Sequence, residues 1–160
     1  MITGIIGAME EEVAKLKSDM TETEEQEKAG MNFLKGKLSG KDVVIVRCGI
    51  GKVNAAVCTQ ILACDYKIDR VINTGVAGGL YSELNVGDIV VSSDALYHDF
   101  DVTGFGYEEG FIPRMKTSIF TADKSLAAKA KDVCEKVNPD IKCFIGRVVS
   151  GDQFVNAKDK

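Results

Sequence analysis

The chain has 160 residues, of which 45% are hydrophobic and 28% are charged, a composition typical of one globular domain with a sizeable core. Its formal charge of -4, without any basic stripe, argues against nucleic-acid binding. The apolar runs are only as long as strands and glutamates appear by position 10, so we expect neither a membrane span nor a signal peptide, and infer a cytoplasmic protein.

The first part of the chain predicts a strand and a helix followed by a hairpin. Residues 4–8 form an apolar run typical of a buried strand, and residues 10–18 carry apolar positions among charges, as an amphipathic helix does. We expect the acidic segment 21–30 to be a solvated connector. After it, the pattern predicts a hairpin that turns at Ser39-Gly40 and has Asp42 to Val46 as its buried half.

The rest of the chain alternates between helical and strand patterns. The expected elements are a helix at 52–64, strands at 70–75 and 86–97, a long loop at 98–113, a helix at 123–137 and a strand at 141–151. Strand, helix and strand in succession predict a right-handed parallel crossover. The sequence therefore predicts the α/β class, with residues 1–160 as a single domain.

The cysteines and the histidine favour structural roles. Five cysteines occur without a C-x-x-C pair, and each lies in an apolar pattern, so we expect buried, reduced thiols at Cys48, Cys58, Cys64, Cys134 and Cys143. The only histidine is His98. A structural zinc site is not expected from this set.

Four predicted strands end in turns that contain glycine. These turns are 7–9, 48–52, 74–79 and 150–154. In open α/β sheets, ligands bind at the carboxyl ends of the strands, so we expect one pocket lined by all four turns. None of the turns has the spacing of a phosphate-binding loop, and three glutamates at 10–12 would repel a phosphate at the first helix.

The three glutamates allow two interpretations. All of them could complement the positive end of the helix dipole at exposed positions, which is the interpretation that we favour for Glu10 and Glu11. Glu12 follows Met9 by nearly one helical turn and could instead face the cleft. A carboxylate there could deprotonate a water molecule or stabilise positive charge, as the cleavage of a glycosidic bond requires.

Five motifs together resemble the 5'-methylthioadenosine/S-adenosylhomocysteine nucleosidases of the purine nucleoside phosphorylase superfamily. The motifs are GIIGAMEEEV (4–13), CGIGKVNAA (48–56), INTGVAGGL (72–80), DALYHDFDVTGFGYEEGFIP (94–113) and SGDQFV (150–155). The resemblance implies a three-layer αβα fold around a central mixed, largely parallel twisted sheet. It also implies hydrolysis of the N-ribosidic bond, which releases adenine and a thioribose in methionine salvage and the methyl cycle, without a cofactor or a metal.

The resemblance also implies roles for individual residues. Glu12 would activate the attacking water. The substrate would be bound by Ala8, Met9 and Ile50 at the ribose and alkylthio pockets, by Val76, Ala77 and Gly78 at the rim and floor, and by Gln153, Phe154 and Val155 around adenine. Phe105 and Pro113, in a loop rich in large apolar residues, would reach across a two-fold axis to the partner subunit's pocket, because the family members are homodimers.

Two departures from the family pattern follow from the same motifs. Val76 stands where many relatives carry serine, and we expect little effect on the reaction type. The chain ends at Lys160, so the fold is expected without its last strand and helices, without the purine-protonating aspartate and without the Met-Glu step that binds the ribose. Since a general acid contributes about 10²–10⁴ in rate, these 160 residues alone are expected to bind poorly and turn over little.

Three alternatives remain open. A nucleoside phosphorylase would need cationic groups for phosphate, whereas Asn73 and Val76 occupy the turn where phosphorylases offer arginine and serine. A non-catalytic adenine-binding module would bind adenine but would not hydrolyse the nucleoside. A flavodoxin-like response domain would need a central aspartate at a strand end, where this chain has Asn73 and Thr74.

Overall fold

The computed structural model describes residues 1–153 and divides into two compact units. The first unit is Met1–Ala77, and the second begins at Gly78. Both units combine a mixed sheet with helices, which confirms the α/β class. The expectation that residues 1–160 form one domain stays a prediction.

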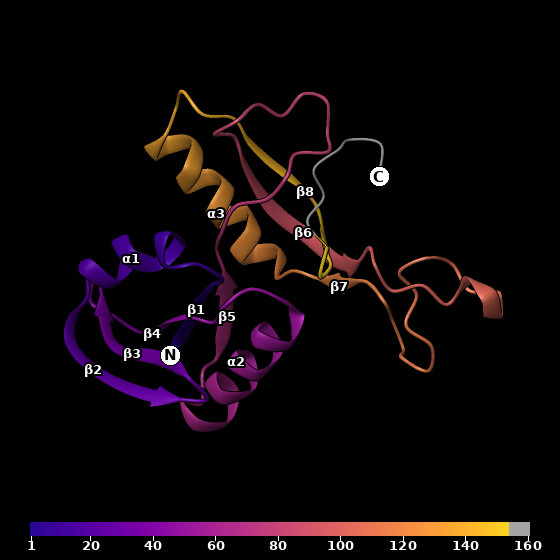
Figure 1. Ribbon diagram of the computed structural model, residues 1–160. Coiled ribbons are helices and arrows are strands. Elements are labelled where there is room, and N and C mark those ends of the chain that lie inside the picture. Colours follow the sequence, from indigo (N-terminus) through magenta and orange to yellow (C-terminus); the bar gives the residue numbers. More distant parts are fainter. Residues whose placement is uncertain (154–160) are drawn as a thin grey trace. The chain divides into compact units, whose positions relative to one another are not determined.

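The first unit is built on a five-stranded sheet in the order β2-β3-β4-β1-β5 (Figure 1). The strands are β1 (Thr3–Gly7), β2 (Thr21–Lys28), β3 (Met31–Leu38), β4 (Lys41–Arg47) and β5 (Arg70–Asn73). β1 pairs in parallel with both β4 and β5, whereas β3 is antiparallel to β4 and to β2. The parallel core places the carboxyl end of β1 between those of β4 and β5.

Helices α1 (Glu10–Ser18) and α2 (Lys52–Asp65) cover the two faces of this sheet (Figure 1). Neighbouring residues of one strand point to opposite faces, which divides the core into two clusters. The α1 side holds Ile5, Val43 and Ile45 with Val13, and the α2 side holds Ile6, Val44 and Val46 with Cys58 and Leu62. The first unit is therefore a helix, sheet, helix sandwich.

The segment 21–30 is not a connector, because Thr21–Lys28 forms strand β2 at the edge of the sheet. Its side chains are almost all exposed, so the strand carries none of the apolar alternation by which strands are recognised. Two tight turns join β2, β3 and β4. Ala29 and Gly30 have φ of 52° and 73°, and Ser39 and Gly40 have φ of 48° and 73°, as hairpin turns of type I′ require.

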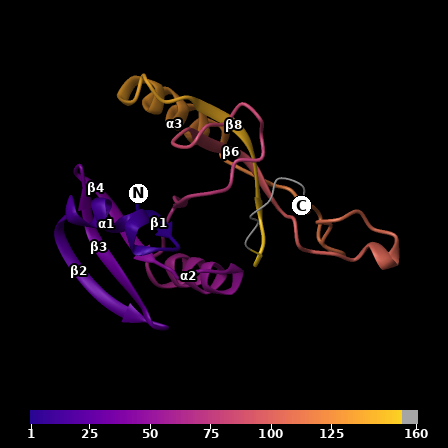
Figure 2. The ribbon, with the colours of Figure 1, turned by 45° about the horizontal axis from the view of Figure 1, so that its top comes forward.

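The second unit has a three-stranded sheet in the order β7-β6-β8. Strand β6 (Ile89–Tyr97) pairs in parallel with β8 (Cys143–Ser150) and antiparallel with the short β7 (Phe120–Thr121). Helix α3 (Lys124–Val137) packs against β6 and β8 (Figure 2). Asp123 caps this helix by accepting a hydrogen bond from the Leu126 amide at 2.8 Å.

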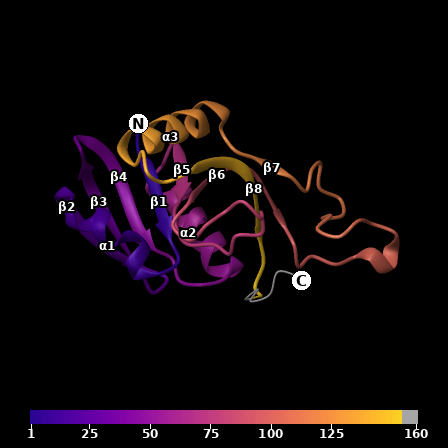
Figure 3. The same cartoon turned by 90° about the horizontal axis from the view of Figure 1, so that it is seen from above.

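Between β6 and β7 the chain makes a long excursion that contains one 3₁₀ turn, η1 (Thr103–Phe105) (Figure 3). Strand β7 was not expected, because a run of two residues carries no periodicity. No helix in residues 1–153 has the length and apolar character needed to cross a bilayer.

All five cysteines are free thiols. Cys48, Cys58 and Cys143 are buried, as expected. The expectation is wrong for Cys64, which is exposed on α2, and only partly met by the half-buried Cys134 on α3. Cys64 lies on the face of α2 that the sheet does not cover, which the helical spacing alone did not reveal.

Candidate active site

The Glu12 carboxylate is held by three backbone amides from two separate turns. Glu12 is the third residue of α1, and its Oε2 accepts hydrogen bonds from the amides of Ala8 at 2.7 Å and Met9 at 3.0 Å. Its Oε1 accepts a hydrogen bond from the Val76 amide at 2.9 Å. The side chain therefore turns back from the helix towards the ends of β1 and β5.

The central position of β1 brings these turns together. The Cys48 amide, just beyond β4, donates to the Gly7 carbonyl at 2.9 Å, and the Thr74 amide, just beyond β5, donates to the Ile6 carbonyl at 2.9 Å. Both bonds extend the parallel pairing by one step past the strand ends. As a result, the turns after β1, β4 and β5 meet at the amino terminus of α1, where the helix dipole favours a negative charge.

Two glycines leave the space that the carboxylate occupies. A Cβ atom on Gly75 would lie 2.5 Å from Oε1 of Glu12 and 2.9 Å from its carboxyl carbon. A Cβ atom on Gly7 would lie 2.7 Å from Cγ1 of Val13 and 3.1 Å from Cβ of Glu12. The end of β1 and the turn after β5 can therefore approach α1 this closely because these two positions lack a side chain.

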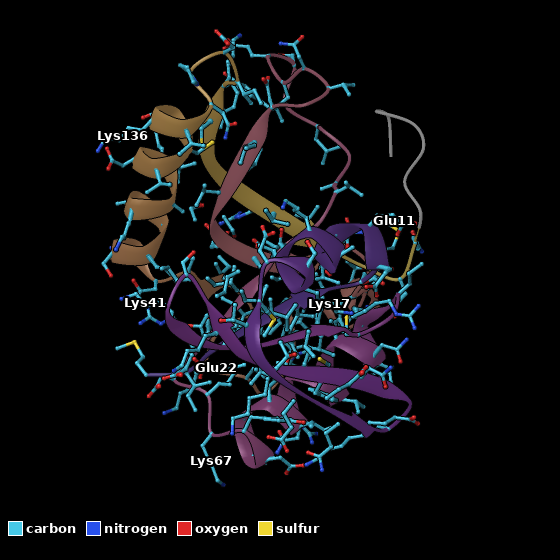
Figure 4. The ribbon with its side chains drawn as sticks, turned by 90° about the vertical axis from the view of Figure 1, so that its left-hand side faces the viewer. Glu11, Lys17, Glu22, Lys41, Lys67 and Lys136 are labelled. Carbon is cyan, nitrogen blue, oxygen red and sulfur yellow. The ribbon has the colours of Figure 1, made fainter. Side chains whose placement is uncertain are left out.

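The other two glutamates of α1 face solvent. Glu10 pairs with Lys17 at 3.0 Å and lies 3.9 Å from Arg47, with half of its side chain exposed. Glu11, which is labelled in Figure 4, is exposed. Of the three neighbouring carboxylates, only that of Glu12 is hydrogen-bonded to the turns after β1 and β5.

The thiols of Cys48 and Cys58 are held in their neutral form. Burial raises the pKa of the Cys48 thiol, and the negative charge of Glu12 raises it further. Burial also raises the pKa of Cys58 to about 12. Cys48 is therefore a protonated neighbour of the carboxylate, whereas a nucleophilic cysteine would need a lowered pKa.

The predicted site residues of the first unit fall into two groups. Ala8, Met9 and Val76 surround the Glu12 carboxylate through their amides. Ile50, just before α2, has 75% of its side chain exposed, and Ala77 is exposed at the end of the unit. Val76 is 80% exposed and only its amide holds Glu12, so a different side chain at this position leaves that contact intact.

The remaining predicted residues belong to the second unit. Gly78 and Gln153 are exposed, Pro113 is half-buried and Phe105 has 85% of its side chain exposed. Near Phe105, the rings of Tyr107 and Phe111 stack with centroids 4.9 Å apart. Phe154 and Val155 lie outside the described residues. The roles of all these residues stay predictions.

Sequence reasoning missed the part that Gly75 and the three amides play. The only signal for Gly75 is its place in TGVAGG, directly after a strand, which does not indicate the residue that it faces. In residues 1–153, no three His, Cys, Asp or Glu side chains gather closely enough to hold a metal ion.

Comparison with known proteins gives consistent matches along the chain. The family model of the phosphorylase superfamily matches residues 2–160. A 5'-methylthioadenosine/S-adenosylhomocysteine nucleosidase from Marinomonas sp. is 47% identical over 155 residues, which cover 97% of this chain and 66% of that protein. The chain thus spans about two thirds of the length of the curated relatives that it matches.

Two crystal structures of such nucleosidases share the fold. The enzyme from Colwellia psychrerythraea, in complex with adenine, superposes with a TM-score of 0.94 at 48% identity, over 99% of this chain and 65% of that one. The enzyme from Neisseria meningitidis, in complex with methylthio-immucillin-A, gives a TM-score of 0.93 at 38% identity, over 99% of this chain and 68% of that one. The similarity of fold therefore extends over nearly the whole chain.

Proposed function

This chain belongs to the phosphorylase superfamily, among its 5'-methylthioadenosine/S-adenosylhomocysteine nucleosidases, and on that premise we propose that its protein hydrolyses the N-ribosidic bond of those two nucleosides. The products are adenine and the corresponding thioribose. The protein acts as a cytoplasmic homodimer on a small adenine nucleoside. Complexes of relatives with adenine and with methylthio-immucillin-A support this substrate class.

The observation that carries the proposal is the fixed carboxylate of Glu12. Three amide hydrogen bonds of 2.7 to 3.0 Å hold both of its oxygens in place, and each oxygen keeps acceptor capacity for a further partner. A water molecule bound there can donate a proton to the carboxylate as it attacks the anomeric carbon. The negative charge also favours the oxocarbenium-like sugar that forms when the bond to adenine breaks.

The preference for water over phosphate rests on the same turns. A phosphate nucleophile needs cationic groups, yet the turn after β5 presents Thr74, Gly75 and Val76 beside a carboxylate. Arg47, the cation at the end of β4, lies 3.9 Å from Glu10 on the outer side of α1. Repulsion by Glu12 therefore disfavours phosphate and leaves water as the nucleophile.

The proposed dimer rests on the exposed apolar residues of the excursion between β6 and β7. Phe105 is 85% exposed and Tyr107 is 43% exposed, and an aromatic patch of this kind is typical of an interface. In the dimer, Phe105 and Pro113 cap the thioether pocket of the partner subunit.

The proposed substrate pocket combines several short segments of the chain. Ala8, Met9 and Ile50 line the ribose and alkylthio side, and Val76, Ala77 and Gly78 line the floor. Gln153, Phe154 and Val155 hold adenine.

The test is the release of adenine from 5'-methylthioadenosine by the protein expressed from its own gene. We expect release without phosphate, and a decrease in kcat of about 10²–10⁴ in Glu12→Gln, which keeps the side-chain size but loses the base. Glu11→Gln is the matched control, because Glu11 is an exposed neighbour on the same helix. Full activity in Glu12→Gln would contradict the proposal, and a strict need for phosphate would identify a phosphorylase instead.

Calorimetry with adenine separates hydrolysis from simple uptake. Binding of adenine together with its release from the nucleoside supports the nucleosidase. Binding of adenine without release from any adenine nucleoside would favour the non-catalytic module.

A further inference from the structure

The turn after β8 is hydrogen-bonded to His98 and Asp99, the two residues that follow β6. The two strands are parallel neighbours, and Tyr97 pairs with Ser150 at their shared carboxyl end. One residue further, the His98 amide donates to the Ser150 carbonyl at 3.0 Å. Oδ2 of Asp99 accepts a hydrogen bond from the Asp152 amide at 2.8 Å. The pairing of β6 with β8 therefore continues beyond the strands, and a carboxylate supplies its last acceptor.

Gly151, in the middle of this turn, is packed against both side chains. A Cβ atom on Gly151 would lie 2.7 Å from Cε1 of His98 and 2.9 Å from Cγ of Asp99. Real Cβ atoms essentially never come this close to other heavy atoms. The imidazole and the carboxyl group thus fill the place of a side chain at 151, so a larger residue there requires these two side chains or the turn to shift.

We propose that His98 and Asp99 are positioning residues for adenine recognition. They fix the turn 150–152, which leads directly into Gln153, Phe154 and Val155. This inference rests on the proposed function, in which those three residues hold the base. His98 and Asp99 contact the turn, so we expect their loss to weaken the binding of adenine and to leave the step that depends on Glu12 unchanged.

The first measurement is amide hydrogen exchange at Asp152 in the protein expressed from its own gene. Asp99→Ala removes the acceptor, and we expect exchange of the Asp152 amide to rise by about tenfold or more. Asp99→Asn keeps a side-chain oxygen at the same place and should restore most of the protection. Exchange that is unchanged in Asp99→Ala overturns the proposal.

The second measurement is the dissociation constant for adenine. We expect Asp99→Ala and Gly151→Ala each to raise the dissociation constant for adenine by about tenfold. The kcat for the nucleoside should change by less than about threefold. Adding His98→Ala to Gly151→Ala removes the imidazole that the new methyl group meets and should recover part of the affinity. Gly146→Ala is the matched control, because a Cβ atom there meets only Cγ1 of Val90 at 3.8 Å.

Failure of this inference can be told apart from failure of the proposed function. If the unaltered protein binds adenine and Asp99→Ala binds it equally well, the positioning role is wrong and the proposed function is unaffected. If the unaltered protein does not bind adenine, the proposed function is wrong. Asp152 exchange then decides whether Asp99 holds the turn. A drop in kcat at unchanged adenine affinity would also overturn the positioning role.

Discussion

The two units differ in how completely their sheets are covered. Within the described residues, every buried hydrophobic residue except Cys143 lies in Met1–Ala77. Strand β4 buries four consecutive residues, Val43 to Val46, between α1 and α2. In β8, by contrast, Ile145 is 48% exposed and Val149 is 38% exposed. A strand with apolar residues on both faces needs to be covered on both faces. In the second unit, α3 is the helix that packs against β6 and β8.

This difference separates two groups of the residues that we propose for the site. Glu12 and the amides of Ala8, Met9 and Val76 are attached to a sheet with its own packed interior. Phe105 and Gln153 come from a unit whose apolar residues are largely exposed. We therefore expect the first unit to dominate stability and the second to respond more strongly to ligand and partner.

The largest expected effect is the loss of a core ring from the first unit. Phe33 is fully buried and stacks on Tyr66 with ring centroids 5.3 Å apart. Phe33→Ala should lower the free energy of unfolding by about 3–5 kcal/mol, because it removes apolar contacts and leaves a cavity. Urea unfolding followed by far-ultraviolet circular dichroism measures the change.

The comparison variant for Phe33→Ala is Ile145→Ala in β8, where nearly half of the side chain is already exposed. It should cost less than about 1–2 kcal/mol, since less apolar area is lost. Equal losses in the two variants would contradict the contrast between the units.

A smaller effect is a decline of stability at alkaline pH that depends on Cys58. Burial raises the pKa of this thiol from 9.0 to about 12 in the folded protein. Between these two values the unfolded chain has lost the proton that the folded protein keeps, so stability falls as the pH rises from 9 towards 12. One proton gives a slope of at most about 1.4 kcal/mol per pH unit.

Urea midpoints measured across this pH range for the unaltered protein and for Cys58→Ala isolate that slope. Cys64→Ala serves as the control, because Cys64 is exposed on the same helix. An unchanged slope in Cys58→Ala would show that the buried thiol of the first unit is not its source.

The smallest expected effect concerns the hairpin between β2 and β3. Ala29 has a φ of 52°, a left-handed conformation that alanine adopts at a cost and asparagine adopts more easily. Ala29→Asn should therefore stabilise the first unit by about 0.5–1 kcal/mol, read as a rise in the urea midpoint. Ala63→Asn, at an exposed position inside α2, should instead destabilise it, because asparagine is a poorer helix former than alanine.

The sequence indicated most elements because their apolar residues follow the period of a helix or a strand. The prediction failed at β2, where the stretch TETEEQEK pairs through its backbone and has no apolar face to reveal it. The spacing of Met9 and Glu12 allowed a carboxylate turned towards the strand ends, and its oxygens accept hydrogen bonds from the turns after β1 and β5. The third amide donor could not be foreseen, because Val76 lies 64 residues further along the chain and contributes no side chain.

The hydrogen bond between the Val76 amide and Glu12 makes one position unusually free to change. Serine, valine or any other residue with an N–H group can occupy it and still anchor the carboxylate, whereas proline cannot. Natural variation at position 76 can thus change the exposed side chain there without cost to the anchor. A sequence comparison that considers side chains alone would overlook the Val76 amide, which is the hydrogen-bond donor furthest along the chain from Glu12.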